Sequence, residues 1–191
     1  LLCFYLNSCM DIIFKDLKKL WGKAVNEEKI DLDSPIGFIS TDTRTLEKGN
    51  FFVPLLGNNF DGHNFLGMAV DIGVQAAIVS ETFKGSIPTS LPHWVVSDTL
   101  YAYQQIALLH RRNLNLPVVA VTGSVGKTTT RELIRGILSS IGGIVSSKAN
   151  ENNDVGVPKT LLKGKESDVA YVLEMGMRGL GQIERLSQIA E

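Results

Sequence analysis

The sequence predicts an α/β protein in which a small mixed α/β domain precedes the first part of a domain built on a parallel β-sheet. Three observations indicate this. After residue 117, strand and helix patterns alternate, which is typical of parallel sheets with crossover helices. A glycine-containing loop joins the first of these strands to its helix, as in P-loop domains. Before residue 113, short apolar runs alternate with many turn residues. We therefore expect two domains, at residues 10–113 and 118–191.

The elements of the first domain follow from apolar spacing and turn signals. Apolar residues at helical spacing predict a helix over residues 11–21. A second helix is expected to close at Gly73, and Asp98 is a suitable N-cap for a third. Short apolar runs bounded by Gly, Asp and Asn predict strands. The expected elements are helices at residues 11–21, 64–73 and 99–113, and strands at residues 36–40, 50–55, 77–79 and 93–97.

The second domain begins after residues 113–117, where Pro117 ends any helix. The run VVAVT that follows is continuously apolar, as expected for a central parallel strand covered on both faces. Further strands are predicted at residues 144–147 and 169–175, and residues 181–191 have the periodicity of a helix. The helix after the loop is expected to end at Gly142 and to carry its apolar residues on one face, namely Leu133, Ile134, Ile137, Leu138 and Ile141.

Composition excludes some classes of protein. The 191 residues are 44% hydrophobic and 20% charged, with a formal net charge of −1. Such a balance gives no overall field that would attract nucleic acid or an anionic membrane, so phosphate recognition must be local. The two cysteines, Cys3 and Cys9, have neither a disulfide framework nor a metal-ligand spacing, which favours a reducing cytoplasm.

Both ends of the sequence indicate a fragment of a longer protein. The opening LLCFYLNSCMDIIF lacks the basic region and cleavage site of a secretory signal, and it is too short to span a bilayer. We expect translation to begin at Met10 rather than Leu1. Because the last residues have helical periodicity without a C-cap, we expect the second domain to continue beyond Glu191.

The stretch TGSVGKTTT has the residues that a phosphate site needs. Helix N-termini present unpaired N–H groups and partial positive charge, which favour an anion. Gly123 and Gly126 let the backbone approach phosphate oxygens, Lys127 supplies a positive charge, and Thr128 offers a hydroxyl to Mg²⁺. The match to G-x-x-x-x-G-K-[ST] is imperfect, because Val121 stands where the first glycine belongs. A glycine-rich turn with an exposed lysine is the alternative.

Phosphate binding alone does not define the reaction, because switch GTPases, kinases and ATP-driven ligases share such loops. A guanine-reading N-K-x-D is not found after the loop, which counts against a GTPase. A non-catalytic nucleotide-binding module and a degenerate remnant of an enzyme stay open as alternatives.

The stretch TGSVGKTTT also resembles the ATP loop of the Mur ligase family, cytoplasmic enzymes that add amino acids to the peptidoglycan precursor. Three further stretches are similar to the same family: NENNDVGVPKTLL at residues 150–162, YVLEMGMRGLGQI at residues 171–183, and STDTRTLEKGNFFVPLLGNNFDGHNF at residues 40–65. The resemblance runs from about residue 36 to the end of the chain, across both expected domains.

Within the family, Val125 stands where relatives usually carry Asn or His, and this resembles the branch that adds D-alanyl-D-alanine to UDP-N-acetylmuramoyl-tripeptide. The resemblance implies an ATP-dependent amide-bond-forming ligase that works through an acyl phosphate, with ATP and Mg²⁺ as cofactors. It also implies a cytoplasmic protein, monomeric at full length, with no nucleic-acid or membrane partner. A diaminopimelate- or lysine-adding sibling is the nearest alternative, and the third residue of the muramyl peptide stays undetermined.

The resemblance implies a role for particular residues, each with a structural alternative. Glu174 could instead cap a neighbouring helix, Asn152 and Asn153 could make turns, and Asp42 could close a turn with Arg44. The family's C-terminal domain and part of its active site are missing, so we expect no turnover from the 191 residues alone. The predicted site residues are Lys127 for catalysis; Gly123, Ser124, Val125, Gly126, Lys127, Thr128, Thr129, Asn152 and Asn153 for ATP; Thr128 and Glu174 for the metal; and Thr41, Asp42, Thr43 and Arg44 for the UDP-sugar.

Overall fold

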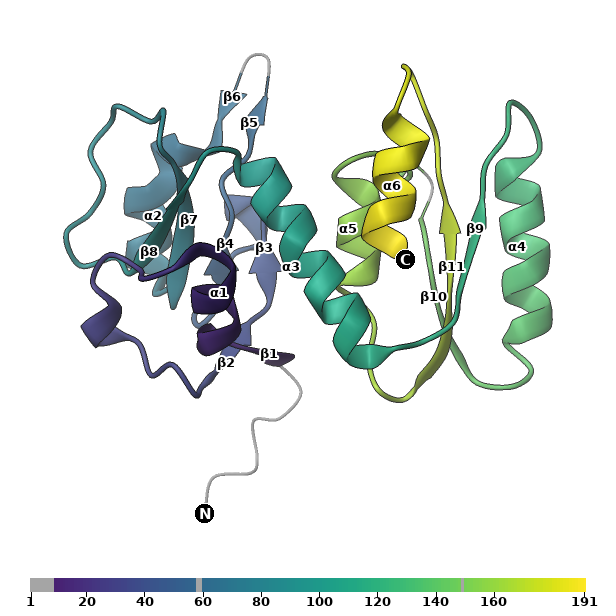
Figure 1. Ribbon diagram of the computed structural model, residues 1–191, viewed down its shortest axis with the longest axis horizontal. Helices are drawn as coiled ribbons and strands as arrows, with labels where there is room; N and C mark the ends of the chain where they lie inside the picture. The colour runs from purple at the N-terminus through teal and green to yellow at the C-terminus, as the bar shows by residue number, and fades with distance from the viewer. Residues whose placement is uncertain (1–8, 58–59, 149) are drawn as a thin grey trace. The chain divides into compact units, whose positions relative to one another are not determined.

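The computed structural model describes residues 9–57, 60–148 and 150–191, and its mixed α/β architecture with parallel sheets confirms the predicted fold class (Figure 1). Residues 1–8, which include Cys3 and most of the stretch before the expected start at Met10, lie outside the described residues. The chain divides into two compact units, one up to Ala102 and one from Tyr103 onward.

The first unit is organised around a four-stranded parallel sheet with the strand order β3-β4-β7-β8. Two small antiparallel pairs, β1 with β2 and β5 with β6, accompany it. The strands are β1 (Cys9–Ile13), β2 (Pro35–Gly37), β3 (Ile39–Ser40), β4 (Phe51–Phe52), β5 (Leu56–Gly57), β6 (Phe60–Asp61), β7 (Ala76–Ser80) and β8 (His93–Val96); the helices are α1 (Phe14–Trp21) and α2 (Leu66–Ile72), with 3₁₀ turns at Glu27–Lys29, Thr43–Thr45 and Gly62–Phe65.

The predicted helix over residues 11–21 was wrong at its start, because Cys9–Ile13 form β1 and α1 begins only at Phe14. Met10 and Ile12 are buried while Asp11 between them is exposed, which is the alternation of a half-buried strand. The expected strand over residues 36–40 is divided between β2 and β3, which pair in different sheets.

Other predicted boundaries of this unit are confirmed. Helix α2 ends at Gly73, whose φ of 91° is in the left-handed region that glycine adopts without a steric cost. Asp98 caps the helix that begins at Thr99: its Oδ1 accepts hydrogen bonds from the backbone N–H groups of Leu100 and Tyr101, at 2.8 and 3.1 Å.

The core of the first unit includes a cluster of aromatic rings. Trp94 lies 6.1 Å from both Phe14 and Phe51 between ring centroids, and all three side chains are buried. The Trp94 indole N–H donates to the carbonyl oxygen of Gly22 at 3.0 Å, so its polar atom is satisfied inside the core. Both packing and hydrogen bonding therefore join α1 to the sheet.

The second unit is a three-stranded parallel sheet with the order β10-β11-β9. Helix α4 lies on one side of this sheet, and α5 and α6 lie on the other (Figure 1). The strands are β9 (Val118–Val121), β10 (Gly143–Ser146) and β11 (Asp168–Glu174); the helices are α4 (Lys127–Leu138), α5 (Gly156–Leu161) and α6 (Gln182–Ala190), together with α3 (Thr99–Leu114), which begins in the first unit.

Three features of the second unit differ from expectation. Residues 150–162, for which no helix was predicted, contain α5. Strand β9 lies at the edge of the sheet formed by the described residues, whereas the apolar run predicted a central strand. The predicted apolar face of α4 is largely exposed, with relative accessibilities of 64% for Leu133 and 72% for Ile137, and the helix ends at Leu138, before Ile141.

The division of the chain into compact units falls within α3, between Ala102 and Tyr103, and a domain boundary at residues 113–117 stays a prediction. Side chains of the later turns of α3, which belong to the second unit, bond to other segments of that unit. Gln104 donates to the carbonyl oxygen of Asp154 at 3.0 Å, and Arg111 donates to that of Ala190 at 3.1 Å. Among the helices of the described ranges, none has the length and apolar character that crossing a membrane requires.

Candidate functional site: a phosphate loop beside a buried carboxylate

The phosphate loop occupies the turn between β9 and α4. Gly126 is the N-cap of α4 with φ 80°, and Gly123 has φ 142°, so both adopt backbone angles that favour glycine. A Cβ on Gly126 would meet no atom within 4 Å, so the backbone angle and not space requires glycine there. No acidic residue lies in the first turn of α4, which leaves the positive end of the helix available to an anion.

Lys127 is the first residue of α4, and its side chain folds back over the loop. The Nζ atom donates a hydrogen bond to the carbonyl oxygen of Gly123 at 2.7 Å. An ammonium group has three donors, so this contact leaves two for another acceptor. The arrangement holds a positive charge across the mouth of the loop.

Glu174 is the last residue of β11, and it lies at the carboxyl end of the parallel strands, where the phosphate loop also begins. It is aligned with Val121, the last residue of β9, and the N–H of Met175 bonds to the carbonyl oxygen of Val121 at 2.9 Å. In open α/β sheets, ligands bind outside the carboxyl ends of the strands. The side chain of Glu174 is only 7% exposed, so water solvates its negative charge poorly.

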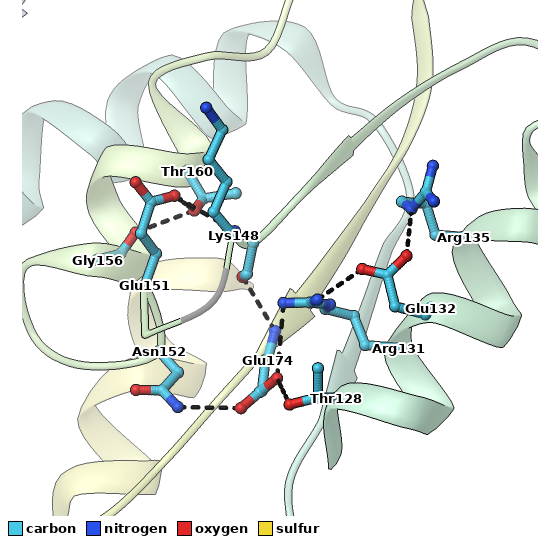
Figure 2. A network of polar contacts seen from close by, with 11 residues as sticks. Thr128, Arg131, Glu132, Arg135, Lys148, Glu151, Asn152, Gly156, Thr160 and Glu174 are labelled. Carbon is cyan, nitrogen blue, oxygen red and sulfur yellow. Dashed lines mark hydrogen bonds and ion pairs between the residues drawn. The ribbon is translucent and has the colours of Figure 1, made fainter. Parts of the chain in front are cut away.

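The Glu174 carboxylate is held by two side chains that the sequence had marked (Figure 2). Its Oε2 accepts a hydrogen bond from Thr128 Oγ1 at 2.8 Å, and its Oε1 accepts one from Asn152 Nδ2 at 3.0 Å. Its backbone N–H donates to Ser147 Oγ at 3.1 Å. The structure therefore brings Thr128, Asn152 and Glu174 together from three separate segments.

The donor set suits Mg²⁺ in its chemistry. Within residues 9–57, 60–148 and 150–191, no group of three or more His, Cys, Asp and Glu side chains could enclose a metal. Mg²⁺ prefers hard oxygen ligands and is commonly bound by one or two protein groups together with substrate phosphates and water. Because the Thr128 hydroxyl gives its proton to Glu174, its lone pairs stay available to a cation. The capping alternative for Glu174 has weaker support, since the carboxylate accepts from the side chain of Thr128.

Sequence reasoning missed Arg131, which lies one turn after Thr128 on α4. Its side chain is 4% exposed, and its Nη1 lies 3.6 Å from Glu174 Oε2. Its Nη2 donates to Glu132 Oε1 at 2.6 Å. The i, i+3 spacing from Thr128 was a signal that could have found it, because such residues share one face of a helix.

The loop before α5 carries both predicted asparagines, which behave differently. Asn153 Oδ1 accepts hydrogen bonds from the N–H groups of Val155 and Gly156, at 3.2 and 2.8 Å, and so begins the turn into α5. Asn152 instead reaches Glu174. Contact of either side chain with ATP stays a prediction.

Glu151 anchors the same loop through a group of basic residues. Burial alone would raise the pKa of its carboxyl group. Hydrogen bonds from Lys163 and Lys159 lower the pKa by more than burial raises it, so the pKa falls from 4.5 to about 2. The Nζ atoms of Lys163 and Lys159 lie 2.8 and 3.1 Å from its oxygens. A Cβ on Gly156 would come within 2.5 Å of the Glu151 backbone, so this close approach also requires a glycine.

The predicted UDP-sugar residues lie in the first unit around the 3₁₀ turn Thr43–Thr45. The Asp42 carboxylate accepts from the backbone N–H of Arg44 at 3.0 Å and is 2.6 Å from Arg44 Nη2. The side chain of Arg44 is 87% exposed, so the turn presents the guanidinium to solvent, whereas Asp42 and Thr43 are half-buried. The salt-bridged turn is therefore present, and a role in UDP-sugar binding for it and for Thr41 stays a prediction.

His63, in the sequence DGH, has a structural role in the first unit. Its Nε2 accepts from the backbone N–H of Ser80 at 2.9 Å, which makes Nδ1 the protonated nitrogen, 2.6 Å from Asp61 Oδ1. Its ring stacks on Phe83 with centroids 5.0 Å apart. Burial raises the pKa of Asp61, yet the hydrogen bonds from the backbone and ring of His63 lower it overall.

Comparison with known proteins identifies the family. The profile of the Mur ligase middle domain matches residues 121–191, which contain both the phosphate loop and Glu174. The UDP-N-acetylmuramoyl-tripeptide–D-alanyl-D-alanine ligase of Synechocystis sp. is 44% identical over 159 residues, or 83% of this chain. The chain belongs to the Mur ligase family. It spans only 35% of the length of that Synechocystis Mur ligase.

Solved Mur ligase structures share the fold. The UDP-N-acetylmuramoylalanyl-D-glutamyl-2,6-diaminopimelate–D-alanyl-D-alanyl ligase from Acinetobacter baumannii matches with a TM-score of 0.83 at 33% identity, covering 98% of this chain and 41% of that protein. The MurF ligase from Thermotoga maritima, solved in complex with ADP, matches with a TM-score of 0.71 at 29% identity, covering 80% of this chain and 35% of that protein.

Proposed function

We propose that this chain is part of an ATP-dependent ligase of peptidoglycan precursor synthesis, which joins D-alanyl-D-alanine to UDP-N-acetylmuramoyl-tripeptide. The observation that carries the proposal is the hydrogen bond between Thr128 of the phosphate loop and the buried carboxylate of Glu174. That pairing sits in a chain whose relatives, at 44% and 40% identity, are named for this reaction. The T. maritima relative was solved with ADP, which supports ATP as the nucleotide.

The reaction explains why a ligase needs a phosphate loop. A carboxylate does not condense with an amine in water, because hydroxide is a poor leaving group. A carboxylate oxygen of the muramyl peptide therefore attacks the γ-phosphorus of ATP, and ADP leaves. The amine of the dipeptide then attacks the acyl carbon of the acyl phosphate, inorganic phosphate leaves, and the amine loses a proton. Phosphoryl transfer of this kind depends mainly on positioning and electrostatics.

The residues of the second unit divide these tasks. The N–H groups at residues 123–128 and the positive end of α4 orient the phosphates. Lys127 exchanges its contact with the Gly123 carbonyl for the β- and γ-phosphates. Thr128 and Glu174 would hold Mg²⁺, with Asn152 fixing the orientation of the carboxylate. When bound, Mg²⁺ neutralises charge on the transferring phosphoryl group.

The turn at Asp42–Arg44, with Thr41 and Thr43, contacts the UDP-sugar in this proposal. What supports the assignment is that Arg44 presents an exposed guanidinium held in a fixed direction by Asp42, which suits a diphosphate or a uracil oxygen. A reaction that consumes ATP and a UDP-linked sugar belongs in the cytoplasm.

A chimera tests the proposal. This chain replaces the matching part of the Synechocystis ligase, and phosphate release is measured with both UDP-N-acetylmuramoyl-tripeptide and D-alanyl-D-alanine present. We expect release that requires both substrates and that Lys127→Ala abolishes. The 191-residue chain by itself should give no turnover. A folded chimera without release, or one in which Lys127→Ala has full activity, would contradict the proposal.

A further inference from the structure

Arg131 is a buried cation to which the proposed reaction assigns no task. Its side chain is 4% exposed and lies on the face of α4 directed at the sheet. Burying a guanidinium is unfavourable unless an opposite charge accompanies it. Because burial of this charge is unfavourable, we infer that the guanidinium compensates the negative charge of the carboxylates beside it.

The guanidinium lies between two carboxylates that differ in their surroundings (Figure 2). Glu132 is 45% exposed and pairs with two arginines, with Arg131 Nη2 at 2.6 Å and with Arg135 Nε at 2.8 Å. Glu174 is 7% exposed, and among the residues that the structure describes its ion-pair partner is Arg131, at 3.6 Å. Glu132 therefore competes for the guanidinium with Glu174, which has no other ion-pair partner in the part of the chain that the structure describes.

The contact between Arg131 and Glu174 is electrostatic rather than a formed hydrogen bond. Charge-assisted N–H···O bonds measure about 2.8 Å, well below the 3.6 Å seen here. The Nε and Nη1 atoms of Arg131 are buried and make no hydrogen bond within the described part of the chain. Arg131 thus balances the charge of Glu174 while leaving the carboxylate oxygens to Thr128 and Asn152.

We propose that Arg131 is a positioning residue that serves as the counter-cation of Glu174 when the nucleotide is absent, and so makes Mg²⁺ binding depend on the nucleotide. The inference rests on the proposed function, because it assumes that Thr128 and Glu174 hold Mg²⁺. A guanidinium already beside the carboxylate repels a divalent cation. The phosphates of ATP bring enough negative charge to outweigh this repulsion, so that the metal and the nucleotide bind cooperatively.

The test makes two measurements on the 191-residue chain. Thermal unfolding without nucleotide gives the Mg²⁺ concentration for half-maximal stabilisation, called the Mg²⁺ requirement below. Calorimetry gives the affinity for ATP with and without Mg²⁺. Arg131→Gln should lower the Mg²⁺ requirement about tenfold or more, as expected for removing one positive charge beside a divalent ion. The same variant should weaken the coupling between Mg²⁺ and ATP by a similar factor. Arg131→Lys keeps the charge and should resemble the unsubstituted chain.

Two neighbouring variants exclude a merely structural role. Glu132→Gln releases Arg131 toward Glu174 and should raise the Mg²⁺ requirement, the opposite direction. Arg135→Gln also breaks a salt bridge to Glu132 but does not reach Glu174, so it is the matched control and should change nothing. A loss of fold stability alone would not reverse sign between Arg131→Gln and Glu132→Gln.

The outcomes separate this inference from the proposed function. If Mg²⁺ does not alter the ATP affinity of the unsubstituted chain, the proposed function fails. If it does, but Arg131→Gln and Arg135→Gln need the same Mg²⁺ concentration, only the role of Arg131 is overturned. Should Arg131→Gln not fold, Glu132→Gln decides: an unchanged or lower Mg²⁺ requirement would overturn the inference.

Discussion

Glu151 offers the sharpest prediction about stability, because it ties the loop that carries Asn152 to α5. Its pKa of about 2 lies below the ordinary value of 4.5. That difference, at about 1.4 kcal/mol for each pH unit, corresponds to about 3 kcal/mol. Its partners Lys159 and Lys163 are 57% and 36% exposed, so solvent screening reduces the expected contribution to about 2 kcal/mol.

The sign of the pH dependence follows from a lowered pKa in the folded state. The stabilisation is complete above pH 4.5, where the carboxyl is ionised even when unfolded, and is lost as the pH falls toward 2. Glu151→Gln should therefore reduce the free energy of unfolding by about 2 kcal/mol at pH 7. The difference between variant and unsubstituted chain should shrink progressively below pH 4.5.

Urea unfolding at a series of pH values measures this difference. Amide exchange of α5 reports the second unit, whereas fluorescence of Trp21 and Trp94 reports the first unit and should be unaffected. Glu166→Gln, at an exposed position before β11, is the matched control. A Glu151→Gln effect of equal size at pH 7 and pH 3 would refute the electrostatic reasoning.

Three further outcomes are expected. Gly126→Ala should destabilise the chain by about 1 kcal/mol, because the backbone at Gly126 has a φ of 80°. Gly136→Ala, in the exposed interior of α4, should instead stabilise the chain by about 0.5 kcal/mol. Equal effects of the two substitutions in urea unfolding would contradict the backbone argument. His63→Ala leaves the N–H of Ser80 without its acceptor, so it should lower the free energy of unfolding by about 2 kcal/mol in the same assay. The affinity for ATP should be unchanged, and a changed affinity would indicate more than a structural role. Arg44→Ala should leave the unfolding transition in place but weaken calorimetric binding of UDP-N-acetylmuramoyl-tripeptide; undiminished binding would exclude the proposed UDP-sugar contact.

Local patterns predicted the features that depend on neighbours in sequence. The alternation of strands and helices, the glycine-bearing turn and the Asp98 cap each depend on a few adjacent residues, and the structure reproduces them. The same reasoning failed at residues 11–13, because Ile12 and Ile13 fit a helical spacing while the burial of Met10 and Ile12 follows a strand. It also missed α5, a six-residue helix that contains Gly156 and Pro158, both poor helix formers.

The site itself required information beyond periodicity. Glu174 was found through a family resemblance, since a carboxylate at the end of an apolar strand has no distinctive local pattern. The role of Arg131 was not predicted, because its partner Glu174 lies more than forty residues later in the sequence. The two side chains come together only when α4 packs against β11. An apolar run such as residues 118–121 likewise predicts a strand but not which strands flank it, which is why the edge position of β9 was not foreseen.

The binding of ATP to the 191-residue chain in the presence of Mg²⁺ tests the central claim most directly. Calorimetry should give saturable binding of ATP and much weaker binding of AMP, because recognition is directed at the outer phosphates. Lys127→Ala should weaken ATP binding about tenfold or more, as expected for the loss of a charge-assisted contact. The exposed lysine variant Lys165→Ala should bind as the unsubstituted chain does. Equal affinities for ATP in the Lys127→Ala and Lys165→Ala variants would contradict the account.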